Sequence, residues 1–507
     1  MQLTLTMTSL LGGLFLMLAT LDAVKAAPNE VNKQSITLPL TKVQSTTPGL
    51  HPQLRLQQHI NRSVRRLARM KRREAPSSRE LEERLYKRVT SLQGEDGALE
   101  RRYNRMGVPR RSSSHTFEKR FNRHGVHQTR PKKSAAGNNL VANNRKGKNK
   151  NKNQLAAPVP PPITTADQPS DTDSLGLDIE AQDIGYLATI QIGTPPRNFE
   201  ILMDSGSADF WVGAENCQSQ DGGGCGNHIF LGAQSSSSFQ DTNTQFQVTY
   251  GTGSVQGDII TDNVLIAGLN LPGHTFGVAT TESVDFSSDQ TPFDGLMGLA
   301  KSQLSEQQTD TPPESLAKQN LIPDAIVSFK LARLADGNND GEITFGSLDQ
   351  TKFDPATLVT LDNVNADGFW EAAVDASSVD GTDTGLQGRT AILDTGTTLM
   401  VVPADDATAI HNLIQGAQSD GQGGFTVPCT TNATVVLTFG GRDFAIDPRD
   451  IAFQPLDPND PSGDCVSGIA SGEIGGPTEW LVGDTFLKNA YFSTDVGKNT
   501  LSLAKLV

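Results

Sequence analysis

One short pattern occurs twice in this chain, and each copy places an aspartate at the end of an apolar run. Residues 201–207 read ILMDSGS, and residues 391–397 read AILDTGT. A carboxylate at the end of an apolar strand is costly unless hydrogen bonds satisfy it. The glycine permits a tight turn whose amides can point back at the carboxylate, and the flanking hydroxyl residues are further donors. The repeat therefore predicts two hydrogen-bonded aspartates, Asp204 and Asp394, in equivalent places.

A second motif follows each copy at a similar distance. Residues 293–299 read FDGLMGL and residues 480–486 read WLVGDTF, so an apolar pair precedes Gly298 and Gly483. These glycines lie 94 positions after Asp204 and 89 positions after Asp394. Short apolar runs separated by Gly, Asn, Asp and Pro turns fill the rest of this region, as is typical of an all-β chain. The matching order predicts two lobes of similar build, each offering one aspartate to a shared cleft.

From about residue 178 to residue 507 these motifs resemble, in the same order, those of the pepsin-like aspartic proteases. The resemblance implies an all-β, bilobal fold in which two similar lobes, residues 174–353 and 354–507, flank a central substrate cleft. It implies a monomeric aspartic-type endopeptidase that acts on proteins and peptides without a cofactor, with Asp204 and Asp394 as the catalytic pair. The residues that would support this pair are Ser205, Gly206, Ser207, Thr395, Gly396 and Thr397.

The chemistry follows from placing two carboxylates close together. Such a pair cannot easily ionise twice, so it shares one proton and titrates as a unit, and aspartic proteases are the usual example of this coupling. The ionised partner would take a proton from a bound water as general base. That water would attack the peptide carbonyl while the protonated partner stabilises the oxyanion. No covalent intermediate is implied, and the sequence does not decide which aspartate is the base.

Residues 247–253, which read QVTYGTG, resemble the flap hairpin of the same family. By this resemblance Tyr250 lies at the flap tip over the cleft, and Gly251 and Thr252 offer backbone groups to an extended substrate. Trp211 matches the position whose indole supports the flap tyrosine. A dinucleotide-binding loop is the competing interpretation of these glycines, but their spacing is wrong by one residue and no βαβ pattern surrounds them.

A long leader of opposite charge precedes this body. Residues 1–26 contain a short apolar core followed by small residues, which predicts a secretory signal peptide rather than a membrane anchor. Residues 27–170 carry a net charge of +20 and residues 171–507 a net charge of −34. A basic segment that lies on the acidic body, or is cut from it, is therefore expected. We divide the segment into a basic propeptide, residues 27–130, and a low-complexity linker, residues 131–173.

The leader also contains a stretch similar to the start of propeptides in this family, because residues 36–42 read ITLPLTK. By analogy, one of its basic residues would occupy the cleft and neutralise the aspartates as an intramolecular inhibitor, although the sequence does not identify which one. A nucleic-acid-binding arm is disfavoured because the segment follows a signal peptide and has few aromatic residues to stack on bases. A zymogen secreted to the extracellular space is predicted, active at acidic pH, with a vacuolar location as the alternative.

All four cysteines lie in the body, and four cysteines allow three pairings. The family resemblance favours one local loop per lobe, Cys217–Cys225 and Cys429–Cys465. The sequon at Asn432 predicts glycosylation in a secreted chain. No metal site is expected, because the histidines of the body are far apart in sequence. Residues 336–347 imitate a calcium-binding loop but lack its final glutamate, so a hairpin turn is predicted there.

Two other functions compete with proteolysis. A pepsin-like fold without activity would serve as a binding protein, and loss of either aspartate would mark it, whereas both are present. A glycosidase with two carboxylates would need several sugar-stacking aromatic residues, and the body offers only three tryptophans. The sequence does not determine the peptide preference.

Overall fold

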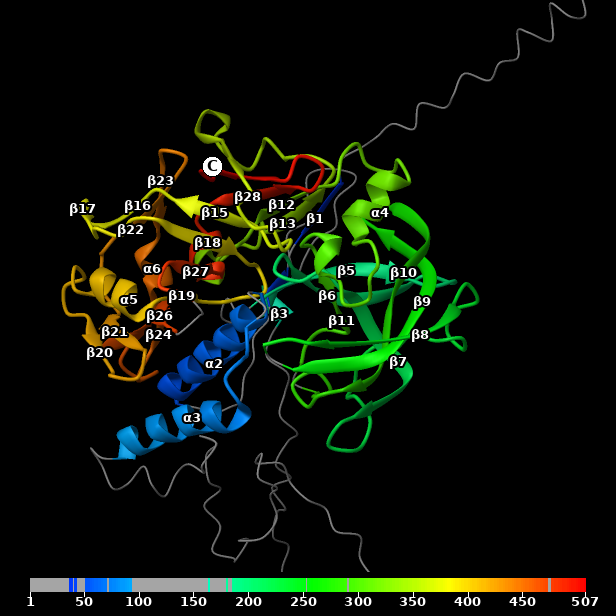
Figure 1. The fold of residues 1–507 in the computed structure, drawn as a ribbon, viewed down its shortest axis with the longest axis horizontal. Coiled ribbons are helices and arrows are strands. Elements are labelled where there is room, and N and C mark those ends of the chain that lie inside the picture. Colours follow the sequence, from blue (N-terminus) through cyan, green and yellow to red (C-terminus); the bar gives the residue numbers. More distant parts are fainter. Residues whose placement is uncertain are drawn as a thin grey trace, which may run out of the picture.

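The chain forms two β-rich lobes that lie side by side, and two helices of the leader pack against them (Figure 1). This computed structural model describes residues 36–39, 41–42, 51–70, 73–93, 163–164, 179–180, 185–251, 253–289, 291–472 and 476–507. The predicted all-β, bilobal architecture is confirmed. The predicted signal peptide lies outside the described residues, as does most of the predicted linker.

The first lobe is built on one large sheet that includes a strand of the leader. Its strands are β2 (Thr41–Lys42), β5 (Tyr186–Ile192), β6 (Arg197–Asp204), β7 (Phe210–Ser219), β8 (Gln240–Thr249), β9 (Ser254–Ile266), β10 (Leu269–Glu282) and β11 (Gly295–Gly298). Their order is β2-β5-β6-β11-β7-β10-β9-β8. Buried and less buried residues alternate along β9, as expected where one face of a sheet packs on the core.

The second lobe distributes its strands over three smaller sheets. The five-stranded sheet contains β15 (Glu371–Val374), β18 (Arg389–Leu393), β27 (Glu479–Val482), β19 (Met400–Val402) and β26 (Ile469–Ser471), in that order. A four-stranded sheet contains β17 (Thr382–Asp383), β16 (Ala376–Val379), β22 (Val435–Phe439) and β23 (Arg442–Ile446). Another contains β20 (Gln418–Ser419), β21 (Phe425–Pro428), β25 (Asp464–Ser467) and β24 (Ala452–Pro455).

A six-stranded sheet joins the two halves of the body to the leader. In order, its strands are β1 (Ile36–Pro39), β13 (Glu342–Phe345), β12 (Ile326–Lys330), β28 (Tyr491–Asp495), β29 (Thr500–Ala504) and β14 (Val359–Asp362). β1 belongs to the leader and pairs antiparallel with β13, so that Ile36 lies opposite Phe345. β12 and β13 form the hairpin predicted in place of a calcium loop. A separate two-stranded pair consists of β3 (Ile163–Thr164) and β4 (Ile179–Glu180).

The leader contributes two long helices, α2 (Pro52–Met70) and α3 (Ser78–Gln93), which the sequence analysis did not predict. Apolar residues of α2 recur every three or four positions and are buried on an apolar wall of the second lobe; they are Leu56, Ile60, Val64, Leu67 and Met70. The other α-helices in the described part of the chain are α4 (Pro312–Lys318), α5 (Ala404–His411), α6 (Pro448–Ile451) and α7 (Asp484–Leu487). None of the helices in this part combines the length and the apolar character that crossing a bilayer requires.

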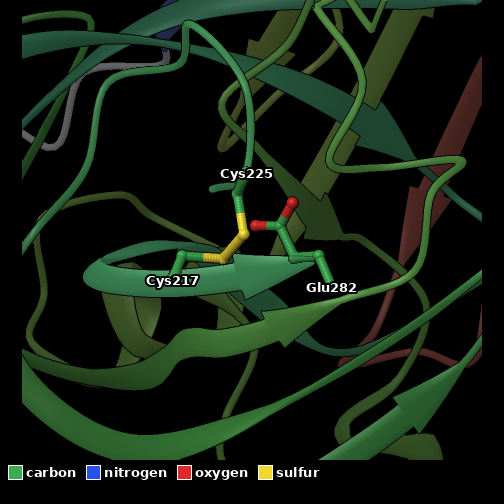
Figure 2. Close-up of side chains that lie close together, drawn as sticks. All are labelled: Cys217, Cys225 and Glu282. Carbon is green, nitrogen blue, oxygen red and sulfur yellow. A yellow bond between two sulfur atoms is a disulfide. The ribbon is translucent and has the colours of Figure 1, made fainter. Parts of the chain in front are cut away.

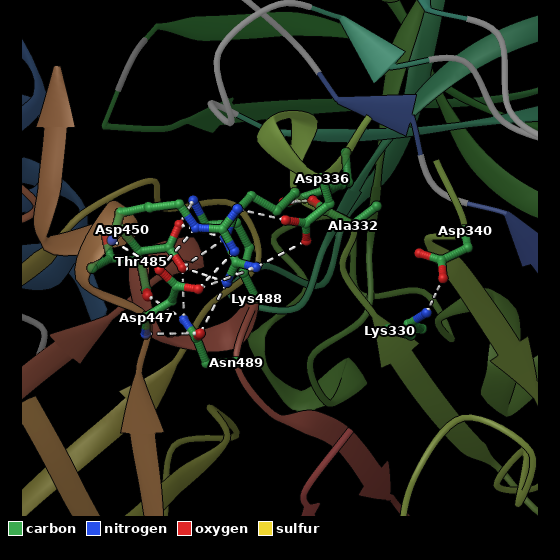
Figure 3. A network of polar contacts seen from close by, with 12 residues as sticks. Lys330, Ala332, Asp336, Asp340, Asp447, Asp450, Thr485, Lys488 and Asn489 are labelled. Atoms are coloured by element: carbon green, nitrogen blue, oxygen red, sulfur yellow. Dashed lines mark hydrogen bonds and ion pairs between the residues drawn. The ribbon is translucent and has the colours of Figure 1, made fainter. Parts of the chain in front are cut away.

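A charged network ties the hairpin of the joining sheet to the second lobe (Figure 3). Arg333, between β12 and β13, contacts Asp450 of α6 with an Nη2–Oδ2 distance of 2.6 Å. Lys488 contacts the other oxygen of Asp450 at 2.5 Å, and Asn489 donates to the carboxylate at 2.9 Å. Burial would raise the pKa of Asp450, but the two cations lower it below its ordinary value. This buried, doubly paired carboxylate thus connects the β12–β13 hairpin with α6 and the end of α7 in the second lobe.

Two disulfides are present, one in each lobe. Cys217–Cys225 closes a loop after β7, and Cys429–Cys465 links the segment after β21 to β25. Glu282, at the end of β10, lies beside the first disulfide (Figure 2). Its side chain is 2% exposed, and burial raises its pKa to about 8.

Glu282→Gln is expected to weaken the pH dependence of stability. The carboxyl group titrates near 4.5 in the unfolded chain and near 8 in the folded one, so the folded state binds more protons between these values. Its contribution to the free energy of unfolding is therefore complete at low pH and lost as the pH rises through this window. When thermal unfolding is measured at about pH 5 and about pH 8, the decrease in Tm between the two pH values should be smaller for the variant than for the unsubstituted protein. An equal decrease in both proteins would contradict this prediction.

Candidate active site

Each aspartate follows a strand that runs parallel to the strand carrying the apolar-glycine motif. Asp204 ends β6, and its register partner on β11 is Gly298. Asp394 follows β18, and its amide donates to the carbonyl of Val482 on β27 at 3.0 Å. The two motifs that recur in the sequence therefore meet in space, once in each lobe.

The recurring glycines are required by the closeness of these contacts. A Cβ atom on Gly298 would lie 2.5 Å from the backbone nitrogen of Ala208. A Cβ atom on Gly483 would lie 1.9 Å from the carbonyl oxygen of Thr397. Both neighbouring atoms belong to the backbone of an aspartate turn, so no side chain fits at either position without moving that turn.

Asp204 is fully buried and held by its own turn. Its Oδ1 accepts from the amide of Gly206 at 2.9 Å, and its Oδ2 accepts from the hydroxyl of Ser207 at 2.7 Å. A Cβ atom on Gly206 would lie 2.4 Å from Oδ1 of Asp394. The glycine of the first turn therefore allows the carboxylate of the second turn to approach.

Asp394 has the same environment. Its Oδ1 accepts from the amide of Gly396 at 2.9 Å, and its Oδ2 accepts from the hydroxyl of Thr397 at 2.7 Å. A Cβ atom on Gly396 would lie 2.4 Å from Oδ1 of Asp204, which repeats the first contact in reverse. Burial raises the pKa of Asp394, and Arg66 and the Thr397 hydroxyl oppose that effect without reversing it.

The first hydroxyl residue of each turn holds the two turns together. The amide of Ser205 donates to Thr395 Oγ1, and the amide of Thr395 donates to Ser205 Oγ, both at 2.9 Å. The Ser205 hydroxyl donates onward to the carbonyl of Leu393 at 3.2 Å, and the Thr395 hydroxyl to that of Met203 at 2.9 Å. The sequence analysis included both residues but did not foresee this reciprocal contact. The only signal for it was a hydroxyl residue directly after each aspartate.

One leader side chain, Arg66 of α2, lies between the two carboxylates. Its Nη2 donates to Oδ1 of Asp204 and to Oδ1 of Asp394, the latter at 2.8 Å. Its Nε donates to Oδ2 of Asp394 at 2.5 Å. Burial would lower the pKa of Arg66, but the two carboxylates raise it above its ordinary value. Arg66 is thus the basic residue that the sequence analysis expected in the cleft without identifying it.

The flap hairpin closes over this site. β8 and β9 pair up to Thr249 opposite Ser254, and the amide of Tyr250 donates to the carbonyl of Gly253 at 2.6 Å. The Tyr250 hydroxyl accepts from Trp211 Nε1 at 2.9 Å, as the resemblance implied. Burial raises the pKa of Tyr250 well above its ordinary value, so the hydroxyl stays protonated.

The tip of the flap touches the leader directly. A Cβ atom on Gly251 would lie 2.4 Å from the carbonyl oxygen of Arg62, so the flap backbone and α2 are in contact. Thr252, which the resemblance placed beside Gly251, lies outside the described residues. In this structure, therefore, α2 occupies the space between the flap and the aspartates.

Two cavities border Arg66. The residues of the body that give the first its apolar lining are Leu202, Tyr250, Phe286, Phe293 and Leu296. The apolar residues of the body along the second are Ala208, Val248, Tyr250, Leu304 and Phe369. A mainly apolar cavity on one side of the polar centre and a cavity of mixed polar and apolar lining on the other suit a ligand that presents side chains in both directions.

Among the described residues, one group of side chains has the spacing of a metal site, and it consists of Cys217, Cys225 and Glu282. The two sulfur atoms are bonded to each other, as Figure 2 shows, and thiolates are the form in which cysteine binds metal. The group therefore offers a single carboxylate and does not fit a metal ion.

Comparison with known proteins agrees with this geometry. The family model for eukaryotic aspartyl proteases matches residues 185–506. A "Probable aspartic-type endopeptidase CTSD" of Trichophyton verrucosum is 36% identical over 344 residues, which cover 68% of this chain and 65% of the relative. The "Aspartic-type endopeptidase ctsD" of Aspergillus fumigatus is 34% identical over 343 residues, which cover 68% of this chain and 70% of the relative. "Cathepsin D" of Dictyostelium discoideum is 30% identical over 331 residues, which cover 64% and 84%.

This chain therefore spans only 65% of the length of the first of these relatives. The family model matches residues 185–506, which include both aspartate turns, both apolar-glycine motifs and the flap hairpin. The chain therefore belongs to the eukaryotic aspartyl protease family.

Proposed function

We propose that this protein is an aspartic-type endopeptidase that is made as an inactive proenzyme and cleaves proteins and peptides at acidic pH. The observation that carries this proposal is the contact of one nitrogen, Nη2 of Arg66, with Oδ1 of both Asp204 and Asp394. Two carboxylates that share one donor atom are close enough to share one water. General base catalysis by such a pair requires this reach.

The proposed reaction begins when Arg66 withdraws and a water takes the place of its Nη2 between the two Oδ1 atoms. The outer oxygens keep their hydroxyl donors, Ser207 and Thr397, so both carboxylates stay oriented. With one proton shared by the pair, the ionised carboxylate accepts a proton from the water as it attacks the peptide carbonyl. The protonated carboxylate donates to the developing oxyanion. As the tetrahedral intermediate collapses, the C–N bond breaks, the amine nitrogen receives the proton taken from the water, and the pair is left again with one shared proton. The flap backbone around Tyr250 would hold the peptide in an extended form.

The proposed division of the chain follows the same logic. Residues 1–26 would be removed as a signal peptide, residues 27–130 would be the inhibitory propeptide, and residues 131–173 would be the linker before the lobes, 174–353 and 354–507. Two contacts of the leader with the body support an inhibitory role. Arg66 pairs with both aspartates, and the edge strand β1 pairs with β13. The mature enzyme would act as a monomer.

We favour secretion of the enzyme to the extracellular space, because residues 1–26 are predicted to be a signal peptide. Asn432 is exposed, which supports glycosylation at its sequon. A vacuole is the alternative, since one relative is named "Probable vacuolar protease A", from Arthroderma benhamiae, at 32% identity over 330 residues.

The proposal is tested by acidifying the purified full-length protein from about pH 7 to about pH 4. We expect two results. Mass spectrometry should show that the N-terminus has changed, and the acidified protein should cleave a denatured protein substrate in a reaction that pepstatin blocks. Cleavage that persists unchanged with pepstatin would overturn the proposal.

Trp211→Phe is expected to lower kcat/KM about 10-fold or less while the fold is retained. The variant removes the indole donor to Tyr250, a hydrogen bond that contributes roughly 0.5–1.5 kcal/mol, and its smaller buried ring lowers the stability as well. The loss should fall mainly on KM, because the bond orders the flap and does not touch the reacting atoms. Steady-state kinetics with one peptide substrate measure both constants. A Trp211→Phe enzyme with unchanged KM and a much lower kcat would contradict this role.

A further inference from the structure

The leader contains a second buried arginine, Arg88, which lies on α3 and follows Arg66 in the sequence. Its side chain is 1% exposed. Its Nη1 donates to the carboxylate of Asp420, and its Nη2 donates to the carbonyl of Gln422 at 3.0 Å. Its Nε donates to the side chain of Gln57 at 2.9 Å. Each nitrogen of the guanidinium thus has its own acceptor, and two of the three acceptors belong to the second lobe.

The loop that receives Arg88 holds its own shape. It joins β20 to β21, and Oδ1 of Asp420 accepts from the amides of Gln422 at 2.8 Å and Gly424 at 2.9 Å. The amide of Asp420 donates back to the carbonyl of Gly424 at 3.0 Å. These bonds lie within the loop and leave Oδ2 for the arginine. The carboxylate is therefore oriented by the body, with or without the leader.

The absence of a side chain at Gly424 makes room for the leader. A Cβ atom there would lie 2.2 Å from Oδ2 of Asp420, 2.6 Å from Leu56 and 2.9 Å from Nη1 of Arg88, so the open position accommodates the loop's own carboxylate as well as the leader. The site thus combines a fixed carboxylate, a carbonyl and an open backbone position. This is the geometry that a planar guanidinium fills, whereas an ammonium group lacks the fork of donors.

Arg88 also connects the two leader helices. Gln57 donates to the side chain of Asn61 at 2.9 Å, and Asn61 donates to the carbonyl of Leu81 at 3.2 Å. A small apolar cluster between the helices contains Leu54, Leu85 and Val89. The helices therefore form one unit with two arginine anchors, one at the aspartates and one at the loop 418–424.

We propose that the loop 418–424 is an arginine-binding site that keeps the α2–α3 unit bound after the leader has been cut from the body. The pair Arg72-Arg73 lies between α2 and α3, whereas the basic pairs Arg101-Arg102, Arg110-Arg111 and Lys119-Arg120 all follow α3, and the inference concerns cuts at these three. A cut at any of them leaves both helices whole and both anchors in place. Cutting and activation are then separate events, and the cut protein is a non-covalent complex. The inference extends the proposed function, since it concerns how long the leader stays in the cleft.

The test uses the full-length chain at about pH 7, where the leader is expected to keep it inactive, with a site for an added protease inserted in residues 131–173. After cutting at about pH 7, the leader should co-elute with the body in size-exclusion chromatography. Arg88→Ala should speed dissociation at least about 30-fold, because loss of one partner of a buried charged contact is costly. Gly424→Ala should also speed dissociation, because the added Cβ atom would crowd the Asp420 carboxylate and the Arg88 guanidinium. Arg88→Lys should give an intermediate rate. Arg79→Ala is the matched control, because Arg79 lies on the same helix but is 87% exposed and pairs with Glu83 of its own helix.

Two results would overturn the inference. One is immediate loss of the leader from the cut protein without the additional substitutions. The other is dissociation of the Arg88→Ala and Gly424→Ala proteins at the unsubstituted rate. Arg88→Ala changes only the leader, so a misfolded body cannot explain its effect. The readout is binding, so it separates this inference from the proposed function: a protein that retains its leader but never cleaves peptides would leave the inference standing and the function wrong.

Discussion

Asp204→Asn is expected to lower kcat/KM for peptide cleavage by about 10³-fold, a loss within the range for removal of a general acid or base. Asparagine keeps the Oδ1 acceptor for the amide of Gly206 but can neither ionise nor hold the shared proton. Asp394→Asn should cost a similar factor, and the double variant little more, because the two residues act as a unit. The rates are measured at about pH 4 on protein from which the leader has been removed.

The matched control for this experiment is Asp209→Asn. Asp209 is also a buried aspartate of the first lobe, but its carboxylate accepts from the Ser305 hydroxyl and the Gln307 amide, both at 2.9 Å. Its replacement should lower the stability and leave most of the activity. An Asp204→Asn enzyme that retained more than about one tenth of the activity, well above the expected loss, would exclude the proposed mechanism.

The two aspartate turns could be predicted from the sequence because their geometry is local. The glycine after each aspartate and the hydroxyl residue beyond it bond to a carboxylate only two or three positions away. The contact between Ser205 and Thr395 could not be predicted in this way, since it joins residues 190 positions apart. Which hydroxyl faces the carboxylate and which faces the other lobe depends on how the lobes meet.

The leader was harder to interpret, because its composition concealed its helices. Its charge predicted a basic propeptide but gave no helix boundaries, although the spacing of Leu56, Ile60, Val64 and Leu67 is that of an amphipathic helix. Arg66 could not have been selected even with the helix in hand. Arg62, Arg65 and Arg69 lie within one turn of it, and the choice among them depends on the rotation of α2 against the second lobe.

Arg66→Gln is expected to make the full-length protein release its leader at a pH at which the parent protein stays inactive. The substitution removes the cation from two buried carboxylates, and loss of one partner of a buried ion pair typically costs about 3–5 kcal/mol. The population of the released state should therefore rise by about 10²-fold or more near pH 7. Activity against a peptide substrate, recorded within minutes of dilution over a series of pH values, measures this release.

The direction of the pH effect follows from the carboxylates. Arg66 opposes the rise in the pKa of Asp394, so the cleft binds more protons once Arg66 has left. Release of the leader therefore takes up protons and is favoured as the pH falls. Arg66→Gln should make release both easier and less dependent on pH, whereas Arg66→Lys keeps the charge and should fall between. If the Arg66→Gln protein stayed inactive near pH 7 and responded to acid with the parent midpoint, the ion pairs of Arg66 would not be what holds the leader in the cleft.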